Sequence, residues 1–239
     1  MLESTNDVNP FEGNKLLGVL PAEERERLQP HLKTVALELK DILHEPDAAI
    51  EYVYFPIDCV TSTLAKMEDG RMVEVGTIGN EGMTGLPVFL GAESVPLVSI
   101  CQIAGNAARM TSDALRSKVG PGDRLHGLLG RFTEATFVFA AQSSACNRLH
   151  STEQRCSRWI LHTDERVGKD EFYLTQEFLS QMLGVRRASV SEVAGIFQGK
   201  GLISYSRGRI KILDRLGLEA VTCECYGVIR KEFERLLDD

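Results

Sequence analysis

The residues best suited to chemistry in this chain are basic side chains concentrated in one short stretch. Residues 186–211 carry Lys and Arg at six positions against a single acidic residue, Glu192, so the stretch has a net charge of +5. Such a concentration of positive charge binds phosphates, and arginine also makes paired hydrogen bonds to guanine. The stretch therefore predicts contact with nucleic acid. Its basic residues are Arg186, Arg187, Lys200, Arg207, Arg209 and Lys211.

The segment QEFLSQMLGVRRASVSEVAG, residues 176–195, has the residue pattern of a helix-turn-helix unit. Such a unit needs a small residue where the two helices touch and a glycine in the turn, and Ser180 and Gly184 stand at these places. Apolar residues must also hold the helices at a fixed angle. These are Leu179, Leu183, Val185, Val190 and Val193.

Side chains around this unit are suited to reading DNA. Thr175 is a natural N-cap for the first helix, so that Gln176 and the positive end of this helix can face a phosphate. The exposed face of the second helix would lie in the major groove. We expect Arg187 to read a base directly, with Glu192 second, whereas Arg186 could equally bind a phosphate. The candidate contacts from this helix are Arg186, Arg187, Ser189, Ser191 and Glu192.

The residues after the unit predict a β-hairpin wing. Residues 203–206 and 210–213 can pair around Arg207 and Gly208, which would place Arg207, Arg209 and Lys211 on the backbone of the nucleic acid. Taken alone, these residues would more simply indicate a solvated edge strand protected from aggregation. Beside a helix-turn-helix unit, the wing is the better interpretation.

The composition fits a globular protein whose acidity lies in one part of the chain. Of 239 residues, 43% are hydrophobic and 26% charged, with a net charge of -7. Residues 1–150 hold 13 Lys and Arg against 20 Asp and Glu, whereas residues 151–239 hold 14 of each. The polar N-terminus predicts no secretory signal, and no apolar run is long enough to span a bilayer. These features predict a cytoplasmic protein.

Two further regions must position the basic stretch. From about Lys33 to Met110, short runs rich in Val, Ile, Tyr and Thr alternate with turns, which predicts a small antiparallel β domain. Leu16, Leu17, Leu20 and Leu28 predict a helical opening before it. A second helix is expected over residues 152–167, before the helix-turn-helix unit.

A long helix is expected over residues 123–149, where 27 residues would span about 40 Å. Positions spaced alternately by four and three are mostly apolar, as in the seam of a two-stranded coiled coil. This seam predicts a dimer interface, although a helix packed on its own β domain would show a similar pattern. The residues of the seam are Leu128, Phe132, Ala135, Phe139, Gln142, Cys146 and Leu149.

A β-roll, a long helix and a C-terminal winged helix in this order resemble the Crp/Fnr superfamily of bacterial transcription regulators. The resemblance is most specific in LTQEFLSQMLGVRRASVSEVAG and KGLISYSRGRIKILD. It implies an α+β fold with an antiparallel β-roll of the jelly-roll type at residues 13–120, a dimerisation helix at 121–150 and a winged helix-turn-helix at 151–239. It also implies a homodimer that binds a two-fold symmetric site on double-stranded DNA and contacts RNA polymerase. Ala188 and Glu192 replace a common glutamate and a common arginine, so a different half-site is expected.

The effector region departs from the members of this family that bind cyclic AMP. Residues 81–86, EGMTGL, resemble the glycine part of the family's phosphate cassette, but Met83 stands where its glutamate would be. No Lys, Arg or His occurs between residues 72 and 108, and a buried phosphate without a cationic partner is unfavourable. We therefore expect no ordinary cyclic-nucleotide binding and leave the effector open. The residues of this candidate pocket are Glu81, Gly82, Met83 and Thr84.

The cysteines and histidines predict no cofactor, no metal site and no catalytic centre. The six cysteines form no CxxC motif, and Cys223 and Cys225, which could hold a metal or form a redox pair, more simply read as two structural thiols. The five histidines show no metal-ligand spacing. A cupin-like enzyme would need clustered histidines in the β domain, where His44 stands alone. A second alternative is a ligand-binding module whose helix-turn-helix contacts a protein rather than DNA.

Overall fold

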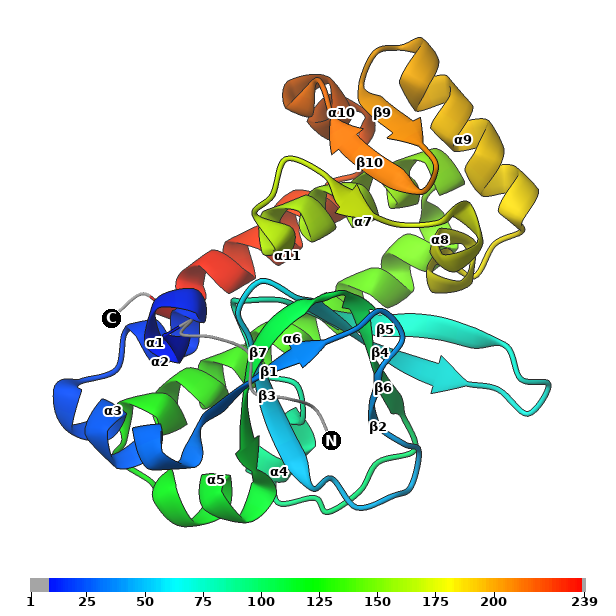
Figure 1. Cartoon of the computed structure of the whole chain (residues 1–239). Coiled ribbons are helices and arrows are strands. Elements are labelled where there is room, and N and C mark those ends of the chain that lie inside the picture. The colour runs from blue at the N-terminus through cyan, green and yellow to red at the C-terminus, as the bar shows by residue number, and fades with distance from the viewer. Residues whose placement is uncertain (1–8, 238–239) are drawn as a thin grey trace.

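Seven strands between residues 33 and 111 form the N-terminal β-roll in the computed structural model, which describes residues 9–237 (Figure 1). They pair antiparallel in two sheets, with strand orders β1-β7-β3 and β2-β6-β4-β5. In β1, Val35 and Leu37 are buried while their neighbours are partly exposed, as expected of a sheet with one face on the core. The strands are β1 (Lys33–Leu37), β2 (Ile42–His44), β3 (Tyr52–Pro56), β4 (Val60–Lys66), β5 (Met72–Ile78), β6 (Val98–Ile103) and β7 (Gly105–Thr111). The predicted antiparallel β domain is confirmed.

Short helices close the β-roll. The predicted helical opening consists of α1 (Pro10–Gly13), α2 (Lys15–Gly18), α3 (Ala22–Leu28) and the 3-10 turn η1 (Gln29–His31). Its four leucines, Leu16, Leu17, Leu20 and Leu28, are all buried. Two more short helices, α4 (Leu86–Phe89) and α5 (Ser112–Lys118), lie between β5 and β6 and after β7. The sequence-based expectation for the N-terminus falls in part on residues 1–8, which lie outside the described residues.

The long helix α6 (Arg124–Leu149) joins the two halves of the molecule (Figure 1). Glu24 of α3 accepts hydrogen bonds from the backbone N–H groups of Arg124 and Leu125, at 2.6 and 3.1 Å, and so satisfies the first turn of the helix. After His150 the chain turns, and Ser151 and Gln154 form a capping box that starts α7 (Thr152–Val167). Both helices were predicted, with nearly the same bounds.

The C-terminal half contains the predicted winged helix. Helices α8 (Gln176–Leu183) and α9 (Arg187–Gly199) are followed by the hairpin of β9 (Ile203–Ser206) and β10 (Arg209–Ile212). The short strand β8 (Phe172–Tyr173) adds to β10, so the wing sheet has the order β8-β10-β9. Helix α10 (Arg215–Val221) follows. None of the described helices is long and apolar enough to cross a membrane.

The last helix, α11 (Cys225–Glu234), returns from the winged helix along α6 toward the β-roll, as the red ribbon in Figure 1 shows. The 3-10 turn η2 (Arg235–Leu237) ends the described chain beside α1 and α2, and Leu236 is buried in the same core as Phe132 of α6. The predicted domain boundaries assigned residues 151–239 to the winged helix and did not include a return of the last helix to the β-roll. Residues 225–237 pack on α6 and the β-roll.

The packing of α6 corrects the predicted dimer seam. Five of its seven positions are buried within the single chain, against the β-roll, α7 or the segment that leads into α11, and are therefore not free to face a partner. They are Leu128, Phe132, Ala135, Phe139 and Cys146. Gln142 is half-buried and donates a hydrogen bond to the Cys225 sulfur, and only Leu149 is well exposed. The alternative of a helix packed on its own domain describes this face.

Candidate nucleic-acid interface

The helix-turn-helix unit has the geometry that its residues predict. Thr175 Oγ1 accepts a hydrogen bond from Phe178 N at 3.1 Å, which caps α8. Gly184 ends α8 with φ of 62°, in the left-handed region that favours glycine. The apolar positions of the pattern are buried except Val185, which is half-buried, and Ser180 is 5% exposed where the helices touch. The predicted motif is therefore a well-packed helix pair.

Helix α9 turns one face outward. Val190, Val193 and Phe197 bury the inner face, whereas Arg187, Ser191 and Glu192 are exposed on the outer one. Arg186 is exposed at the N-cap and Ser189 is half-buried. In Figure 1 this helix lies at the outer edge of the molecule, away from the β-roll. Its outer face is thus accessible to a large ligand such as a duplex.

The wing is a tight hairpin whose turn holds Arg207 with φ of 50° and Gly208 with φ of 79°. Arg207 is exposed at the tip. Arg209 forms an ion pair with Glu171 at 2.8 Å, and Lys211 lies 3.8 Å from Asp170. The charges of these two residues are thus partly neutralised by acidic neighbours before β8, which the count over residues 186–211 did not include.

A depression of about 320 Å³ brings four of the ten predicted DNA contacts together. The start of α8, the start of α9 and the wing meet there. The Tyr205 side chain in its lining is held in place by a hydrogen bond that its hydroxyl donates to the Leu174 carbonyl at 2.7 Å. The depression is lined by Tyr173, Thr175, Gln176, Glu177, Arg187, Tyr205, Arg207 and Gly208. The predicted residues outside this lining are Arg186, Ser189, Ser191, Glu192, Arg209 and Lys211.

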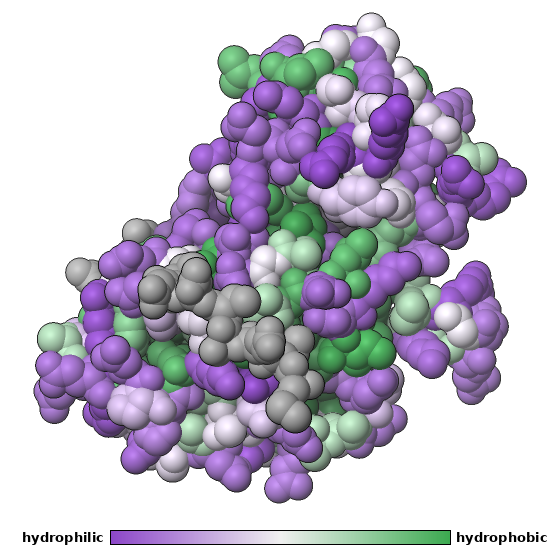
Figure 2. All heavy atoms as spheres, viewed as in Figure 1, coloured by the Kyte–Doolittle hydropathy of each residue, from purple (hydrophilic) through white to green (hydrophobic). Residues whose placement is uncertain are grey.

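The surface chemistry of this half agrees with a polar partner. Figure 2 shows largely hydrophilic side chains over α9 and the wing, and an apolar patch over α10, where Leu213 and Leu216 are 57% and 78% exposed. Two arginines beside the N-terminus of an eight-residue helix can hold phosphate oxygens, and Arg187 stands on the helix that a major groove would admit.

The four predicted effector residues do not line the main cavity of the β-roll. Met83 is fully buried in the core, and a Cβ at Gly82 would lie 2.3 Å from the Phe132 ring. Thr84 Oγ1 lies 2.6 Å from Thr61 Oγ1. Glu81 instead points to Arg166 of α7. These four residues serve packing and a contact with the C-terminal half.

The cavity of the β-roll lies beside residues 85 and 86, directly after these four residues, and is lined mostly by apolar groups. It has a volume of about 250 Å³ and is bounded by β4, β5, β6 and α4, by α6 and by Phe233 of α11. No Lys or Arg lines it, and burial lowers the pKa of His44, its one histidine, so this imidazole is neutral at pH 7. The cavity thus lacks a partner for a phosphate.

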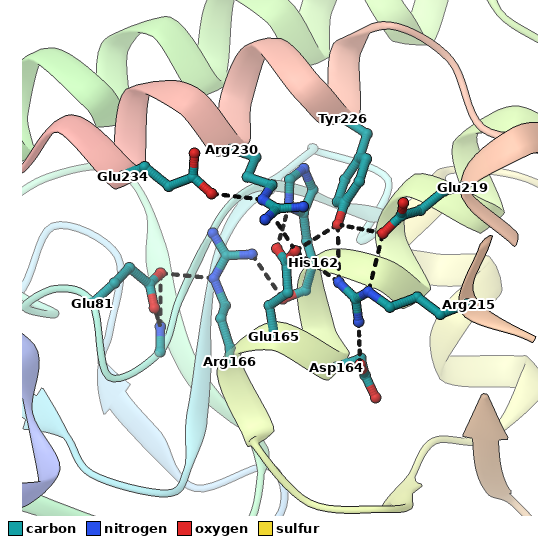
Figure 3. A network of polar contacts seen from close by, with 11 residues as sticks. Glu81, His162, Asp164, Glu165, Arg166, Arg215, Glu219, Tyr226, Arg230 and Glu234 are labelled. Carbon is teal, nitrogen blue, oxygen red and sulfur yellow. Dashed lines mark hydrogen bonds and ion pairs between the residues drawn. The ribbon is translucent and has the colours of Figure 1, made fainter. Parts of the chain in front are cut away.

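A network of charged residues joins the β-roll to the C-terminal half (Figure 3). Arg166 Nε donates to Glu81 Oε1 at 2.7 Å, and both side chains are almost completely buried. Arg215 contacts Asp164 and Glu165 at 2.7 and 2.8 Å. Tyr226 of α11 donates to Glu165, so β-roll, α7, α10 and α11 meet in one network. Local patterns could not predict it, because Glu81, Arg166 and Tyr226 come from distant parts of the chain.

Burial sets the protonation of the network. It lowers the pKa of His162 to about 4, although a hydrogen bond with Glu165 opposes this. Burial also disfavours the charged form of Glu165, but hydrogen bonds from His162 and Tyr226 and the nearby Arg215 lower its pKa to about 2. At pH 7 the network therefore holds a neutral imidazole and an ionised carboxylate.

These values predict that acid destabilises the protein. The unfolded chain binds a proton on His162 below pH 6.5, whereas the folded state does so only near pH 4, so the free energy of unfolding falls through this window by roughly 3 kcal/mol. Urea unfolding at pH 7 and pH 5 tests this with His162→Gln, which we expect to lose less stability between these two values. An equal loss in both proteins would contradict the buried neutral imidazole. Glu165 acts only below its unfolded pKa of 4.5 and leaves the comparison unaffected.

The comparisons with known proteins agree with this geometry. A family model for the Crp-like helix-turn-helix domain matches residues 154–221, which cover α7 to α10. A transcriptional regulator of the Crp/Fnr family from Eubacterium rectale is similar in structure, with 16% identity and a TM-score of 0.66 over 88% of this chain and 98% of that chain. FixK2 from Bradyrhizobium japonicum shows 16% identity and a TM-score of 0.69 over 80% of this chain and 98% of its own. The search of curated protein sequences finds no match.

Fold and helix-turn-helix together define a DNA-binding transcription regulator. Residues 154–221 belong to the family of Crp-like helix-turn-helix domains, and the chain shares its α+β fold with Crp/Fnr regulators over most of its length. Members of this family regulate transcription and are not enzymes.

Proposed function

We propose that the protein is a homodimer that binds a two-fold symmetric site on double-stranded DNA in the cytoplasm, with α9 of each protomer in a major groove. The depression lined by Arg187, Arg207 and the start of α8 carries this proposal, because an arginine suited to reading a base lies there beside two groups suited to binding phosphate. In this scheme residues 13–120 regulate, 121–150 dimerise and 151–239 bind DNA. Contact with RNA polymerase is a prediction of the family resemblance.

The face of α6 that remains free supports dimerisation. Opposite the buried seam runs an exposed row spaced by three and four residues, consisting of Gly127, Gly130, Glu134, Phe137, Ala141 and Ser144. Phe137 is 72% exposed at its centre, and the small residues on either side allow a second helix to approach closely. A second copy of α6, related by a two-fold axis, would cover this row.

The effector, if one acts, is proposed to be a small, uncharged and mostly apolar molecule. The support is the lining of the β-roll cavity, which offers no arginine or lysine for a phosphate and only a neutral histidine. A ligand there would touch Thr136 and Phe139 of α6 and Phe233 of α11, and so could bias both helices. This is a different chemistry from that of a cyclic nucleotide.

Replacing Arg187 with alanine is expected to weaken specific DNA binding by about 1–3 kcal/mol, mainly at one base position, because the lost side chain reads a base. Arg207→Ala should instead weaken binding to all sequences and lower the salt dependence, as a phosphate contact does. Lys231→Ala on α11 removes the same charge away from the interface and serves as the control. Fluorescence anisotropy with single-base variants of a selected site measures all three. A loss in Arg187→Ala that is uniform across sequences would contradict base reading.

A further inference from the structure

Three cysteines and a histidine converge where the long helix ends and the last helix begins. Cys146 and His150 lie one turn apart at the end of α6, and Cys223 and Cys225 precede and start α11. Their sulfur and ring nitrogen atoms all lie within 4.8 Å of one another. The three cysteines are buried, and the His150 side chain is 16% exposed. The interpretation of Cys223 and Cys225 as two structural thiols, and of His150 as lacking metal-ligand spacing, did not foresee this cluster.

The distances within this cluster match a tetrahedral ion with mixed sulfur and nitrogen ligands. Zinc bonds of about 2.3 Å to sulfur and 2.0–2.1 Å to nitrogen give tetrahedral edges of about 3.8 Å between sulfurs and about 3.6 Å between sulfur and nitrogen. Cys146 Sγ and Cys223 Sγ are 3.6 Å apart, and Cys225 Sγ and His150 Nδ1 are 3.5 Å apart. A disulfide would need sulfurs at about 2 Å. The space fits a single ion rather than a multi-iron cluster, whose irons and sulfides separate its ligands.

Neighbouring side chains hold the candidate ligands in place by hydrogen bonds, as is usual around protein metal sites. His150 directs Nδ1 to the cluster, and its Nε2 lies 3.4 Å from Glu224 Oε1. A carboxylate on the far nitrogen is the usual support of a ligating histidine, because it fixes the ring and the tautomer. Gln142 Nε2 donates to Cys225 Sγ at 3.2 Å, a bond that a thiolate strengthens. The half-buried Gln142, a polar residue in the otherwise apolar seam, thus finds a role.

The charge balance of this region also favours an anionic metal centre. Arg158 of α7 is 5% exposed, and no carboxylate pairs with it among the ion pairs of residues 9–237. Within the described part of the chain, its Nε has no hydrogen-bond partner, and its Nη1 reaches Ser143 Oγ at 3.5 Å. Arg158 lies near enough to interact electrostatically with the Cys146 sulfur. Three thiolates and one divalent cation carry a net charge of -1, which supplies the missing partner of this buried guanidinium.

We propose that Cys146, His150, Cys223 and Cys225 bind one zinc ion. The ligands flank residues 151–222, so the ion would join the two ends of the winged helix and hold it at a fixed angle to α6. Such closed four-ligand sites are structural, because no position remains for water. The ion would therefore act on DNA binding through the orientation of α9 rather than through chemistry of its own.

The test uses the full chain purified without added chelator. We expect about one zinc per chain by plasma mass spectrometry, and at least a tenfold lower content in Cys223→Ala and His150→Ala. Cys101→Ala, at a buried cysteine in β6 outside the cluster, should keep its zinc. If an alanine variant fails to fold, wild-type protein stripped of metal and titrated with Co²⁺ gives a second measurement. One equivalent should produce the intense visible bands of tetrahedral cobalt with thiolate ligands.

Several outcomes would overturn the proposal. One is wild-type protein that contains no zinc and whose cobalt form lacks tetrahedral bands, and another is a zinc content that stays unchanged in both cluster variants. The others are stoichiometric iron with acid-labile sulfide, and a Cys146–Cys223 disulfide in freshly purified protein. Restoration of the thermal midpoint of stripped wild-type protein by Zn²⁺, but not by Mg²⁺, would support it.

Discussion

Replacing Arg166 with alanine is expected to reduce the free energy of unfolding by about 3–5 kcal/mol, because it leaves the Glu81 carboxylate buried without its partner. The Arg166 side chain is 5% exposed and that of Glu81 10%, and their contact of 2.7 Å links α7 to the β-roll. The guanidinium also lies 5.9 Å from the Phe139 ring and 5.4 Å from the Phe233 ring, so alanine loses packing on α6 and α11 as well. Such a loss is a large share of the stability of a typical domain.

Chemical denaturation at pH 7 measures this loss of stability, and two further variants serve for comparison. Arg209→Ala breaks an exposed pair with Glu171 and should change stability by less than about 1 kcal/mol. The double variant Glu81→Gln with Arg166→Met removes both charges and should be less damaging than Arg166→Ala alone. If Arg166→Ala were as mild as Arg209→Ala, the buried pair would not join the two halves as described.

Replacing Phe137 with glutamate is expected to abolish dimerisation at micromolar concentrations. In the proposed dimer two copies of this side chain are buried near the two-fold axis, and two unpaired carboxylates there would be strongly unfavourable. We expect the dimer dissociation constant to rise by at least about 100-fold, or about 2.7 kcal/mol. Affinity for a full symmetric site should fall with it, because each protomer would then hold only one half-site.

Analytical ultracentrifugation measures the dimer constant, with Ile42→Glu as the matched control. Ile42 on β2 is also an exposed apolar residue, at 55%, but lies outside α6. Both variants should keep the helical content of the wild-type protein, since each changes an exposed side chain. A Phe137→Glu protein that remains a dimer would place the interface elsewhere.

Local patterns predicted the DNA-binding half well because its structure depends on local residues. The helix pair from Gln176 to Gly195, the turn at Gly184 and the wing around Arg207 are each set by residues within a few positions of one another. The same holds for α7, which begins at its own capping box, whereas the first turn of α6 is satisfied by the distant Glu24. Periodicity, turn chemistry and the spacing of residues within the helix-turn-helix unit sufficed for these predictions.

The errors concern contacts between distant parts of the chain. A row of apolar residues such as Leu128 and Phe132 shows that α6 has a buried face, but not whether its own β-roll or a second chain covers it. The return of α11 could not be foreseen either, because Leu236 finds its core only through the tertiary fold. Glu81 and Arg166 are 85 positions apart. The local signs of the thiol-histidine cluster were the close spacing of Cys223 and Cys225 and the i, i+4 spacing of Cys146 and His150 at the end of α6.

The most direct test of the account is selection of DNA fragments by the purified full-length protein from a random pool, followed by titration of the winning sequence at several salt concentrations. We expect an enriched two-fold symmetric motif whose half-sites lie about one helical turn apart, with an affinity that falls steeply as salt rises. Recovery of no enriched motif, or binding that is insensitive to salt, would contradict the assignment of α9 and the wing as the DNA-reading surface.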